Sequence, residues 1–133
     1  ADRSGFCREF GAVETGFDEI IEEADIITLH VPLTENTENL IDKSVLAKMK
    51  PSAFLVNTSR GRVVHQGDLH QALVSGEIAG AGLDVFWEEP PVEAEFLQLP
   101  NLMVTPHIGG NAREAVEAMG RAAIQNLVEF FGL

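Results

Sequence analysis

Short apolar runs alternate with amphipathic segments along this chain. The continuous apolar runs, which are rich in β-branched or small residues, predict strands at 25–31, 53–56, 78–85 and 102–105. Apolar residues at helical spacing predict short helices at 17–24, 42–49 and 68–74. Gly76 is expected to end the third of these helices. Strands alternating with helices are typical of an α/β fold with a doubly wound parallel sheet, and continuous apolar strands indicate a sheet covered on both faces.

A longer helix is predicted from Asn111 to about Phe131. Asn111 is a candidate N-cap, and Glu114 is placed to complete a capping box. A polar stripe comprises Arg113, Glu117, Arg121, Gln125 and Glu129, and an apolar stripe comprises Val116, Met119, Ala123, Leu127 and Phe130. The stripes predict one face in solvent and one face against a core. Because the helix is long for this domain, we expect its end to pack on another segment.

The composition restricts the class of protein. The 133 residues are 45% hydrophobic, enough for the core of one domain, and carry a net charge of −12. That charge argues against nucleic acid and against an anionic membrane as partners, although local positive groups can still bind a small anion. A single cysteine, Cys7, excludes an internal disulfide and fits a reducing compartment. With no signal-peptide pattern and no long apolar run, we expect a cytoplasmic protein without a membrane partner.

Side chains suited to catalysis follow the predicted strands. They are His30, Arg60, Asp84, Glu89 and His107. In a doubly wound sheet, ligands collect at the carboxyl ends of the strands. An arginine matches a carboxylate with its planar fork, and a histidine exchanges protons near neutral pH. Each residue alone has a common structural explanation, such as a turn or a surface ion pair, but together they predict an enzyme site for a small carboxylate.

Four stretches in this chain resemble one enzyme family. They are LHVPLT (29–34), MKPSAFLVNTSRG (49–61), AGAGLDVFWEEP (79–90) and TPHIGG (105–110). Their order and nearly full coverage of the chain resemble the D-isomer-specific 2-hydroxyacid dehydrogenases. The resemblance implies an oxidoreductase that transfers hydride between NAD(H) and a small D-2-hydroxy acid or 2-keto acid. The phosphoglycerate dehydrogenase branch looks most similar, which makes 3-phosphoglycerate a candidate substrate, and the glyoxylate/hydroxypyruvate reductases are close behind.

The resemblance also implies a role for each catalytic residue. Arg60 would hold the substrate carboxylate and keto oxygen, and His107 would be the acid/base. Glu89 would hydrogen-bond the far ring nitrogen of His107. Glu88 is the neighbouring alternative, but the family pattern places the glutamate directly before the proline, which is Pro90 here.

Cofactor contacts follow from the same resemblance. Asp84 would bind the nicotinamide carboxamide, while Thr58 and Ser59 would lie against the nicotinamide ribose. The adenine side would be flanked by His30 and Pro32.

Two glycines and one acid complete the expected cofactor contacts. Gly109 and Gly110 would let the backbone approach the nicotinamide, although a simple turn explains them equally well. Asp2 would bond the adenosine ribose and favour NAD over NADP, with a frayed acidic terminus as the alternative. No metal site is expected.

One part of the family pattern is missing. The sequence has no GxGxxG, nor the first strand and the helix that bracket it. Residues 1–110 therefore match the C-terminal two-thirds of a dinucleotide-binding domain that is Rossmann-like and incomplete. Residues 111–133 would form the long helix that packs toward the missing substrate domain. We expect these residues alone to bind NAD poorly.

Two rival functions stay open at this stage. One is a regulatory, NAD-sensing protein similar to the C-terminal-binding corepressors on the same scaffold. The other is a folded but inactive fragment. The resemblance further implies a homo-oligomer, since family members commonly dimerise through their cofactor domains.

Overall fold

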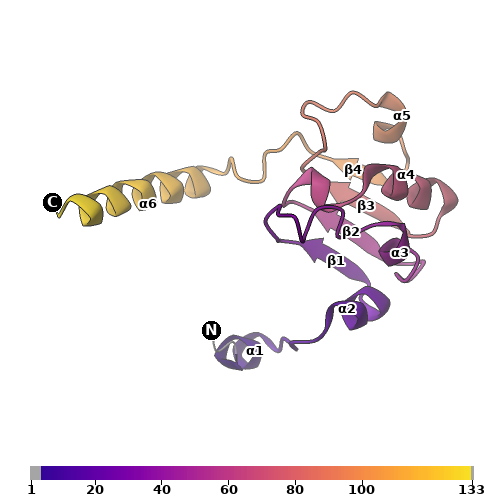
Figure 1. The fold of residues 1–133 in the computed structure, drawn as a ribbon, viewed down its shortest axis with the longest axis horizontal. Helices are drawn as coiled ribbons and strands as arrows, with labels where there is room; N and C mark the ends of the chain where they lie inside the picture. Colours follow the sequence, from indigo (N-terminus) through magenta and orange to yellow (C-terminus); the bar gives the residue numbers. More distant parts are fainter. Residues whose placement is uncertain (1–3, 133) are drawn as a thin grey trace.

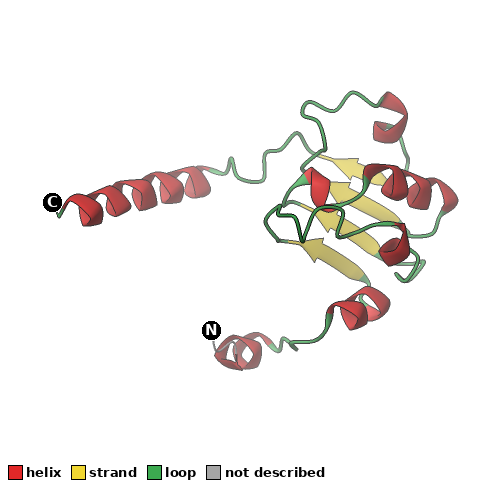
Figure 2. Ribbon diagram, viewed as in Figure 1, coloured by secondary structure: helices red, strands yellow, loops and turns green. Residues whose placement is uncertain are grey.

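The computed structural model describes residues 4–132, arranged as a four-stranded sheet with short helices and one long outlying helix (Figures 1 and 2). Asp2, a predicted cofactor contact, lies outside the described residues. The elements in chain order are α1 (Ser4–Phe10), α2 (Phe17–Glu23), β1 (Ile26–Leu29), α3 (Lys43–Leu46), β2 (Phe54–Asn57), the 3₁₀ turn η1 (Gly61–Val63), α4 (Gln66–Ser75), β3 (Gly80–Leu83), α5 (Ala94–Leu97), β4 (Leu102–Val104) and α6 (Arg113–Phe131).

All four strands are parallel and lie in the order β1-β2-β3-β4. Phe54 pairs with Ile26 on one side and with Gly80 on the other, so the strands are in close register. The parallel α/β sheet predicted from the alternating pattern is therefore confirmed. Because crossovers between parallel strands are right-handed, a consecutive strand order brings every connecting helix to the same face.

The core lies on that helix-covered face. Alternate strand residues point into it, and Leu29, Leu55 and Leu83 are buried there. The connecting segments contribute Leu46, Val63, Leu69, Ile78 and Phe96, all of which are at most 1% exposed.

The opposite face of the sheet is open. Ile26, Phe54 and Met103 point to this side and are 65%, 50% and 66% exposed. The prediction of a sheet covered on both faces is therefore wrong for residues 4–132. The apolar runs were interpreted correctly as strands, but no described helix packs over the second set of side chains.

Local hydrogen bonds set the boundaries of the shorter helices. Asp42 caps α3 by accepting from the Val45 N–H at 3.1 Å. Hydrogen bonds from the Ser44 hydroxyl and the Val45 N–H lower the pKa of Asp42. Gly76 adopts a left-handed conformation (φ 71°) and ends α4, as predicted.

The long helix α6 extends away from the sheet at the end of an irregular segment (Figure 1). Its N-cap is Ala112 and has no side-chain cap, so the capping box expected at Asn111 and Glu114 is wrong. The polar stripe is confirmed by two hydrogen bonds, Arg113 to Glu117 at 3.0 Å and Gln125 to Glu129 at 2.8 Å.

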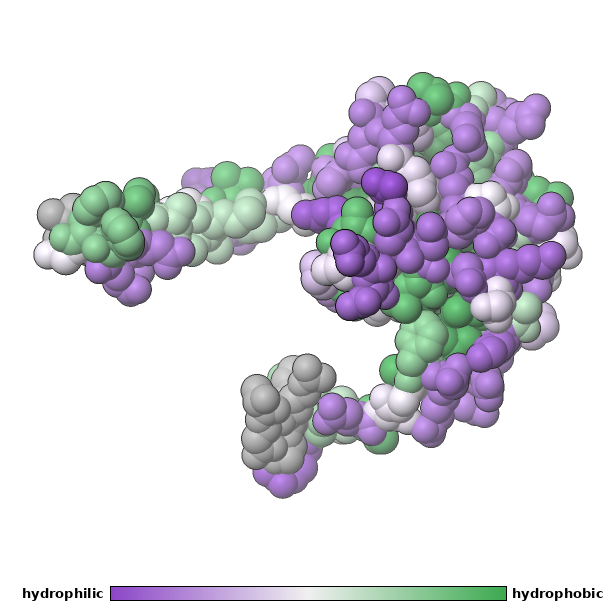
Figure 3. All heavy atoms as spheres, in the orientation of Figure 1, coloured by the Kyte–Doolittle hydropathy of each residue, from purple (hydrophilic) through white to green (hydrophobic). Residues whose placement is uncertain are grey.

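The apolar stripe of α6 faces solvent. Figure 3 shows apolar side chains along the outlying helix, and the exposed ones include Val116, Met119, Leu127 and Phe130. No residue of the described helix is buried, so the expected core contact is absent within residues 4–132. Among the described residues, no helix is both long and apolar enough to cross a membrane.

Candidate active site

Three loops gather at the carboxyl edge of the sheet. The loop after β2 carries Arg60, the loop after β3 carries Asp84 and Glu89, and the turn after β4 carries His107. Parallel strands place these loops at one edge, which is where the sequence pattern predicted a site.

Asn57, the last residue of β2, fixes the turn that carries Arg60. Its side chain is fully buried. Asn57 Oδ1 accepts from the Ser59 N–H at 3.0 Å and from the Ser59 hydroxyl at 2.9 Å, while Nδ2 donates to the Arg60 carbonyl at 2.9 Å. One buried amide thus satisfies three polar groups in the turn and holds the backbone on both sides of Thr58.

A cleft of about 530 Å³ lies beside this turn. It is lined by His30, Val31, Pro32, Leu33, Thr58, Ser59 and Arg60. Five predicted site residues, from the loops after β1 and β2, therefore share one surface. Within β1 and the loop that follows, the Thr28 hydroxyl lies 3.0 Å from His30 Nε2. A second hollow of about 150 Å³ is lined by Thr58, Asp84 and Thr105, so Thr58 lies at the junction of the two.

Glu89 and His107 form a direct pair. Glu89 Oε2 lies 2.7 Å from His107 Nδ1, and Glu89 Oε1 accepts from the Phe86 N–H at 3.1 Å. The contact expected from the sequence is present. Hydrogen bonds from the His107 ring and from the Phe86 N–H lower the pKa of Glu89.

An ionised carboxylate can only accept a hydrogen bond, so the proton of this pair lies on Nδ1 of His107. The other ring nitrogen, Nε2, is then the atom that can give or take a proton. His107 itself has φ 54°, an uncommon conformation for a residue with a side chain. Glu88, the neighbouring alternative, is exposed and makes no such contact with the imidazole in the described structure.

Asp84 is buried beneath the turn that carries His107. Its carboxylate accepts from the Ile108 N–H at 2.9 Å, from the Gly109 N–H at 2.8 Å and from the Thr105 hydroxyl. Burial alone would raise the pKa of Asp84, but these three hydrogen bonds outweigh it and the pKa is lowered. Asp84 is therefore an anion that holds the turn.

The two predicted glycines differ in their surroundings. A Cβ on Gly109 would lie 2.8 Å from Asp84 Oδ2, so the close approach of this backbone to the carboxylate requires glycine. A Cβ on Gly110 would meet nothing within 4 Å. The structure thus gives a physical reason for Gly109 within the protein itself.

Gly61 joins the Arg60 loop to the Glu89 loop. A Cβ at this position would lie 2.1 Å from the carbonyl carbon of Phe86 and 2.6 Å from the Trp87 nitrogen. The two backbones therefore touch, one residue from Arg60 and three residues from Glu89. This backbone contact positions Arg60 and Glu89 relative to each other, and Gly61 makes it without a side chain.

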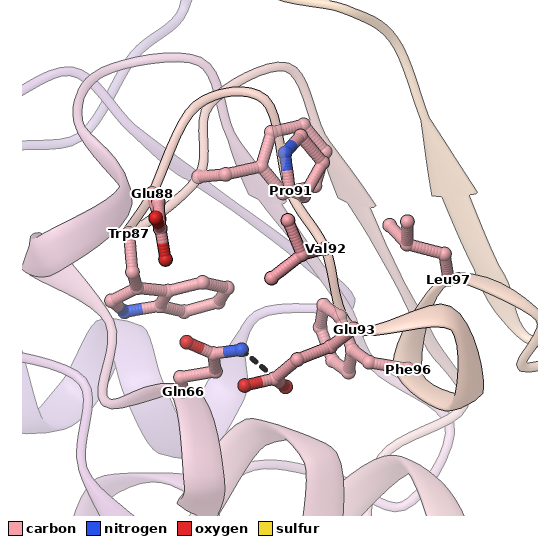
Figure 4. Close-up of a pocket in the computed structure, with 9 residues that line it drawn as sticks. Gln66, Trp87, Glu88, Pro91, Val92, Glu93, Phe96 and Leu97 are labelled. Carbon is pink, nitrogen blue, oxygen red and sulfur yellow. Dashed lines mark hydrogen bonds between the residues drawn. The ribbon is translucent and has the colours of Figure 1, made fainter.

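Trp87 is half-buried and packs against the core. Its indole N–H donates to the Val64 carbonyl, and its ring packs edge-on against Phe96 with centroids 5.8 Å apart. Figure 4 shows it in a small hollow, of about 30 Å³, that Gln66 and Glu93 border with a hydrogen bond between them. Trp87 therefore covers apolar surface.

Sequence reasoning missed three residues of the site: Asn57, Gly61 and Thr105. Asn57 bonds within its own turn, Gly61 meets the backbone of the loop after β3, and the Thr105 hydroxyl bonds to Asp84. Only their positions inside the matched stretches hinted at them. No cluster of three or more potential metal ligands occurs among residues 4–132.

Comparison with known proteins identifies the family. The D-isomer specific 2-hydroxyacid dehydrogenase NAD-binding domain matches residues 2–109. The chain is 48% identical over 122 residues to a glyoxylate reductase of Thermococcus litoralis, covering 92% of this chain and 37% of that protein. The chain thus spans well under half the length of this relative.

Similarity to solved structures supports the same family. The fold matches apo D-mandelate dehydrogenase of Rhodotorula graminis with a TM-score of 0.89 and 36% identity, covering 98% of this chain and 38% of that one. It also matches a D-isomer specific 2-hydroxyacid dehydrogenase from Lactobacillus delbrueckii ssp. bulgaricus, in its NAD complexed form, with a TM-score of 0.77 and 35% identity over 89% of this chain and 40% of that one. The chain belongs to the D-isomer specific 2-hydroxyacid dehydrogenase family and corresponds to its NAD-binding domain.

Proposed function

We propose that this chain supplies the catalytic edge of an NAD-dependent dehydrogenase that reduces a small 2-keto acid to a D-2-hydroxy acid. The observation that carries the proposal is the 2.7 Å contact between Glu89 and His107 Nδ1. It leaves one imidazole nitrogen for proton exchange, at the same edge of the sheet as the cleft lined by Arg60.

The cleft fits part of a dinucleotide. It has a charged side chain at Arg60 and hydroxyl groups at Thr58 and Ser59, and an apolar wall at Pro32 and Leu33. We assign Thr58 and Ser59 to the nicotinamide ribose and His30 and Pro32 to the adenine side. Asp84, Gly109 and Gly110 are assigned to the nicotinamide. When bound, NADH supplies the hydride that reduces the carbonyl carbon.

The chain's own residues handle the carboxylate and the proton. Arg60 binds the substrate carboxylate through its guanidinium fork. His107 Nε2 gives a proton to the carbonyl oxygen during reduction and takes it back in the reverse direction. Glu89 holds the ring and stabilises its protonated form. General acid/base catalysis of this type contributes about 10²–10⁴ in rate.

Glyoxylate or hydroxypyruvate is our first choice of substrate. The support is the similarity to proteins named glyoxylate reductase, at 43–48% identity in two archaeal relatives. Phosphohydroxypyruvate, the keto acid related to 3-phosphoglycerate, is the second choice on the motif resemblance. We further propose NAD rather than NADP through Asp2, a homodimer, and a cytoplasmic location.

The exposed helix α6 has a place in this proposal. Its apolar stripe has no described partner within the chain, and the relatives have segments that this chain lacks. We assign the stripe to contact with the substrate domain.

The test is a chimera. The matching 122-residue segment of the Thermococcus litoralis glyoxylate reductase is replaced by this chain, and NADH oxidation is followed with glyoxylate, hydroxypyruvate and phosphohydroxypyruvate. We expect turnover with at least one keto acid. His107→Gln should lower kcat by about 10²–10⁴ while NADH affinity is retained. Arg60→Gln should mainly raise KM for the keto acid.

Two adjacent glutamates provide a matched control. Glu89→Gln should lower kcat, whereas Glu88→Gln should leave it unchanged, because only Glu89 contacts His107. Equal effects of the two variants, or a His107→Gln chimera that retains most of its turnover, would overturn the assignment.

A further inference from the structure

The turn that carries His107 is closed around one buried carboxylate. Asp84 is 6% exposed and accepts three hydrogen bonds, from the hydroxyl of Thr105 and from the N–H groups of Ile108 and Gly109. The donors lie on both sides of His107 in the sequence. Both ends of the turn are therefore attached to the same side chain.

Thr105 makes three hydrogen bonds with its N–H, its carbonyl and its hydroxyl. Its N–H donates to the Leu83 carbonyl at 2.9 Å and extends the β3–β4 ladder by one residue. Its carbonyl accepts from the His107 N–H at 3.0 Å, and its hydroxyl donates to Asp84 Oδ1. One residue thus links the end of β4, the buried anion and the catalytic residue.

His107 needs such support because its φ of 54° is unfavourable. Strained backbone conformations persist where surrounding contacts over-determine them. Within residues 4–132, the imidazole ring has one hydrogen bond, to Glu89 Oε2, and a single partly exposed pair is weak. The turn is therefore restrained mainly by its hydrogen bonds to the buried Asp84 carboxylate.

We propose that Thr105 is a positioning residue for His107: its hydroxyl completes the grip of Asp84 on the turn and so keeps the imidazole at Glu89. The inference rests on the proposed function only in that His107 is taken to be catalytic. The positioning itself is a property of the folded chain. This role of Thr105 is additional to its place at the end of β4. It is also separate from the cofactor contact assigned to Asp84.

Removal of the hydroxyl alone isolates this role. Thr105→Val keeps the β-branched shape but leaves Asp84 Oδ1 with only the Ile108 N–H as a donor. A buried carboxylate that loses a donor becomes harder to keep ionised in place. The turn then relaxes, and His107 spends less time at Glu89.

The experiment measures the Glu89 carboxyl by NMR in the 14.4 kDa chain. Because the contact with His107 is the main cause that lowers the pKa of Glu89, loss of that contact raises this pKa toward the ordinary range of glutamate. We expect the rise in Thr105→Val, and none in Thr105→Ser, which restores the hydroxyl. Thr15→Val is the matched control, since Thr15 also donates to a carboxylate, that of Glu19, far from the site.

A second measurement needs no variant. In the unmodified chain, acid titration of Asp84 should move the amide signals of Ile108 and Gly109 with the same midpoint as the Asp84 carboxyl. Amide signals that ignore this titration, or an unchanged pKa of Glu89 in a folded Thr105→Val, would overturn the proposal. If the chimera proves inactive while these shifts occur, the positioning role stands and only the proposed function fails.

Discussion

At the scale of single residues, the contact at Gly61 connects the two halves of the site. The backbone of Gly61 touches the backbone of Phe86 and Trp87, so a methyl group cannot be added without moving one of the loops. Arg60 and Glu89 lie on opposite sides of this contact. Their relative placement depends on a residue that has no side chain.

Gly61→Ala should therefore destabilise the chain by about 1–3 kcal/mol, the usual cost of forcing an extra carbon into a packed region. Urea unfolding measures this change. Gly110→Ala is the matched control, because its added methyl meets no atom within 4 Å, and it should change the free energy of unfolding by less than about 0.5 kcal/mol. Similar values for the two variants would contradict the close packing seen at Gly61.

Because of two carboxylates of the site, we expect the free energy of unfolding to decrease in acid. The pKa values of Asp84 and Glu89 are lowered in the folded chain. Their contribution to stability is thus present above the pKa values of the unfolded chain and is lost as the pH falls through the folded values. The free energy of unfolding should decrease as the pH drops below about 5.

Urea unfolding between about pH 7 and pH 3 tests this expectation. Glu89→Gln should show a shallower decrease than the unmodified chain, whereas Glu88→Gln should follow the unmodified chain. A stability that does not depend on pH in this interval would show that the two carboxylates are not held as described.

Which site residues could be predicted depended on how they act. Arg60, Glu89 and His107 could be found because an arginine, a glutamate and a histidine after strands have recognisable chemistry. Asn57 could not, because its amide bonds only within its own turn and has no recognisable catalytic chemistry. Thr105 could not, because its hydroxyl donates to a buried carboxylate of another loop, and that partner is set by the packing of strand ends.

At the scale of elements, apolar patterning located the strands within about two residues and missed what surrounds them. The strands were predictable because each presents apolar side chains to the core. The short elements α1, η1 and α5 were not predicted, since their three to seven residues, unlike those around α2 and α3, did not stand out by apolar residues at helical spacing. The amphipathic character of α6 was predicted correctly, but its sequence does not show that the apolar stripe is left uncovered by the other described residues.

The stability of the sheet should not depend on α6. Deletion of residues 113–133 should change the free energy of unfolding by less than about 0.5 kcal/mol, because no described residue of α6 is buried. By hydrogen exchange, the amides of α6 should show little protection, since most helical stability in proteins comes from tertiary packing and no described residue of α6 is buried. Those of β2 and α4 should be protected.

Ile41→Val provides a reference value for the change in the free energy of unfolding caused by the deletion. Ile41 is fully buried, and loss of one methyl group there should cost about 0.5–1.5 kcal/mol. A deletion that costs more than Ile41→Val would mean that α6 packs on the body of the chain.

At the scale of the whole molecule, the described sheet is open on one face, and β1 and β4 are its two edge strands. Ile26, Phe54 and Met103 are exposed on the face, and β1 has a paired neighbour, β2, on one side only among the described strands. A dinucleotide site in a doubly wound sheet lies where two halves of the sheet meet. The described strands follow one another in sequence order from β1 to β4 and so form one half of such a sheet.

The isolated chain should therefore bind NADH about 10²–10⁴-fold more weakly than the glyoxylate reductase chimera and give no measurable turnover. The sequence has no GxGxxG, so the charge-assisted hydrogen bonds that such a loop gives to the cofactor's phosphates are missing. Two such bonds at about 1.5–3 kcal/mol each account for a loss of this size. Titration of NADH fluorescence with each protein measures the ratio. If the two proteins bind NADH equally well, the half of the site described here is sufficient by itself, and the open edge at β1 has no part in cofactor binding.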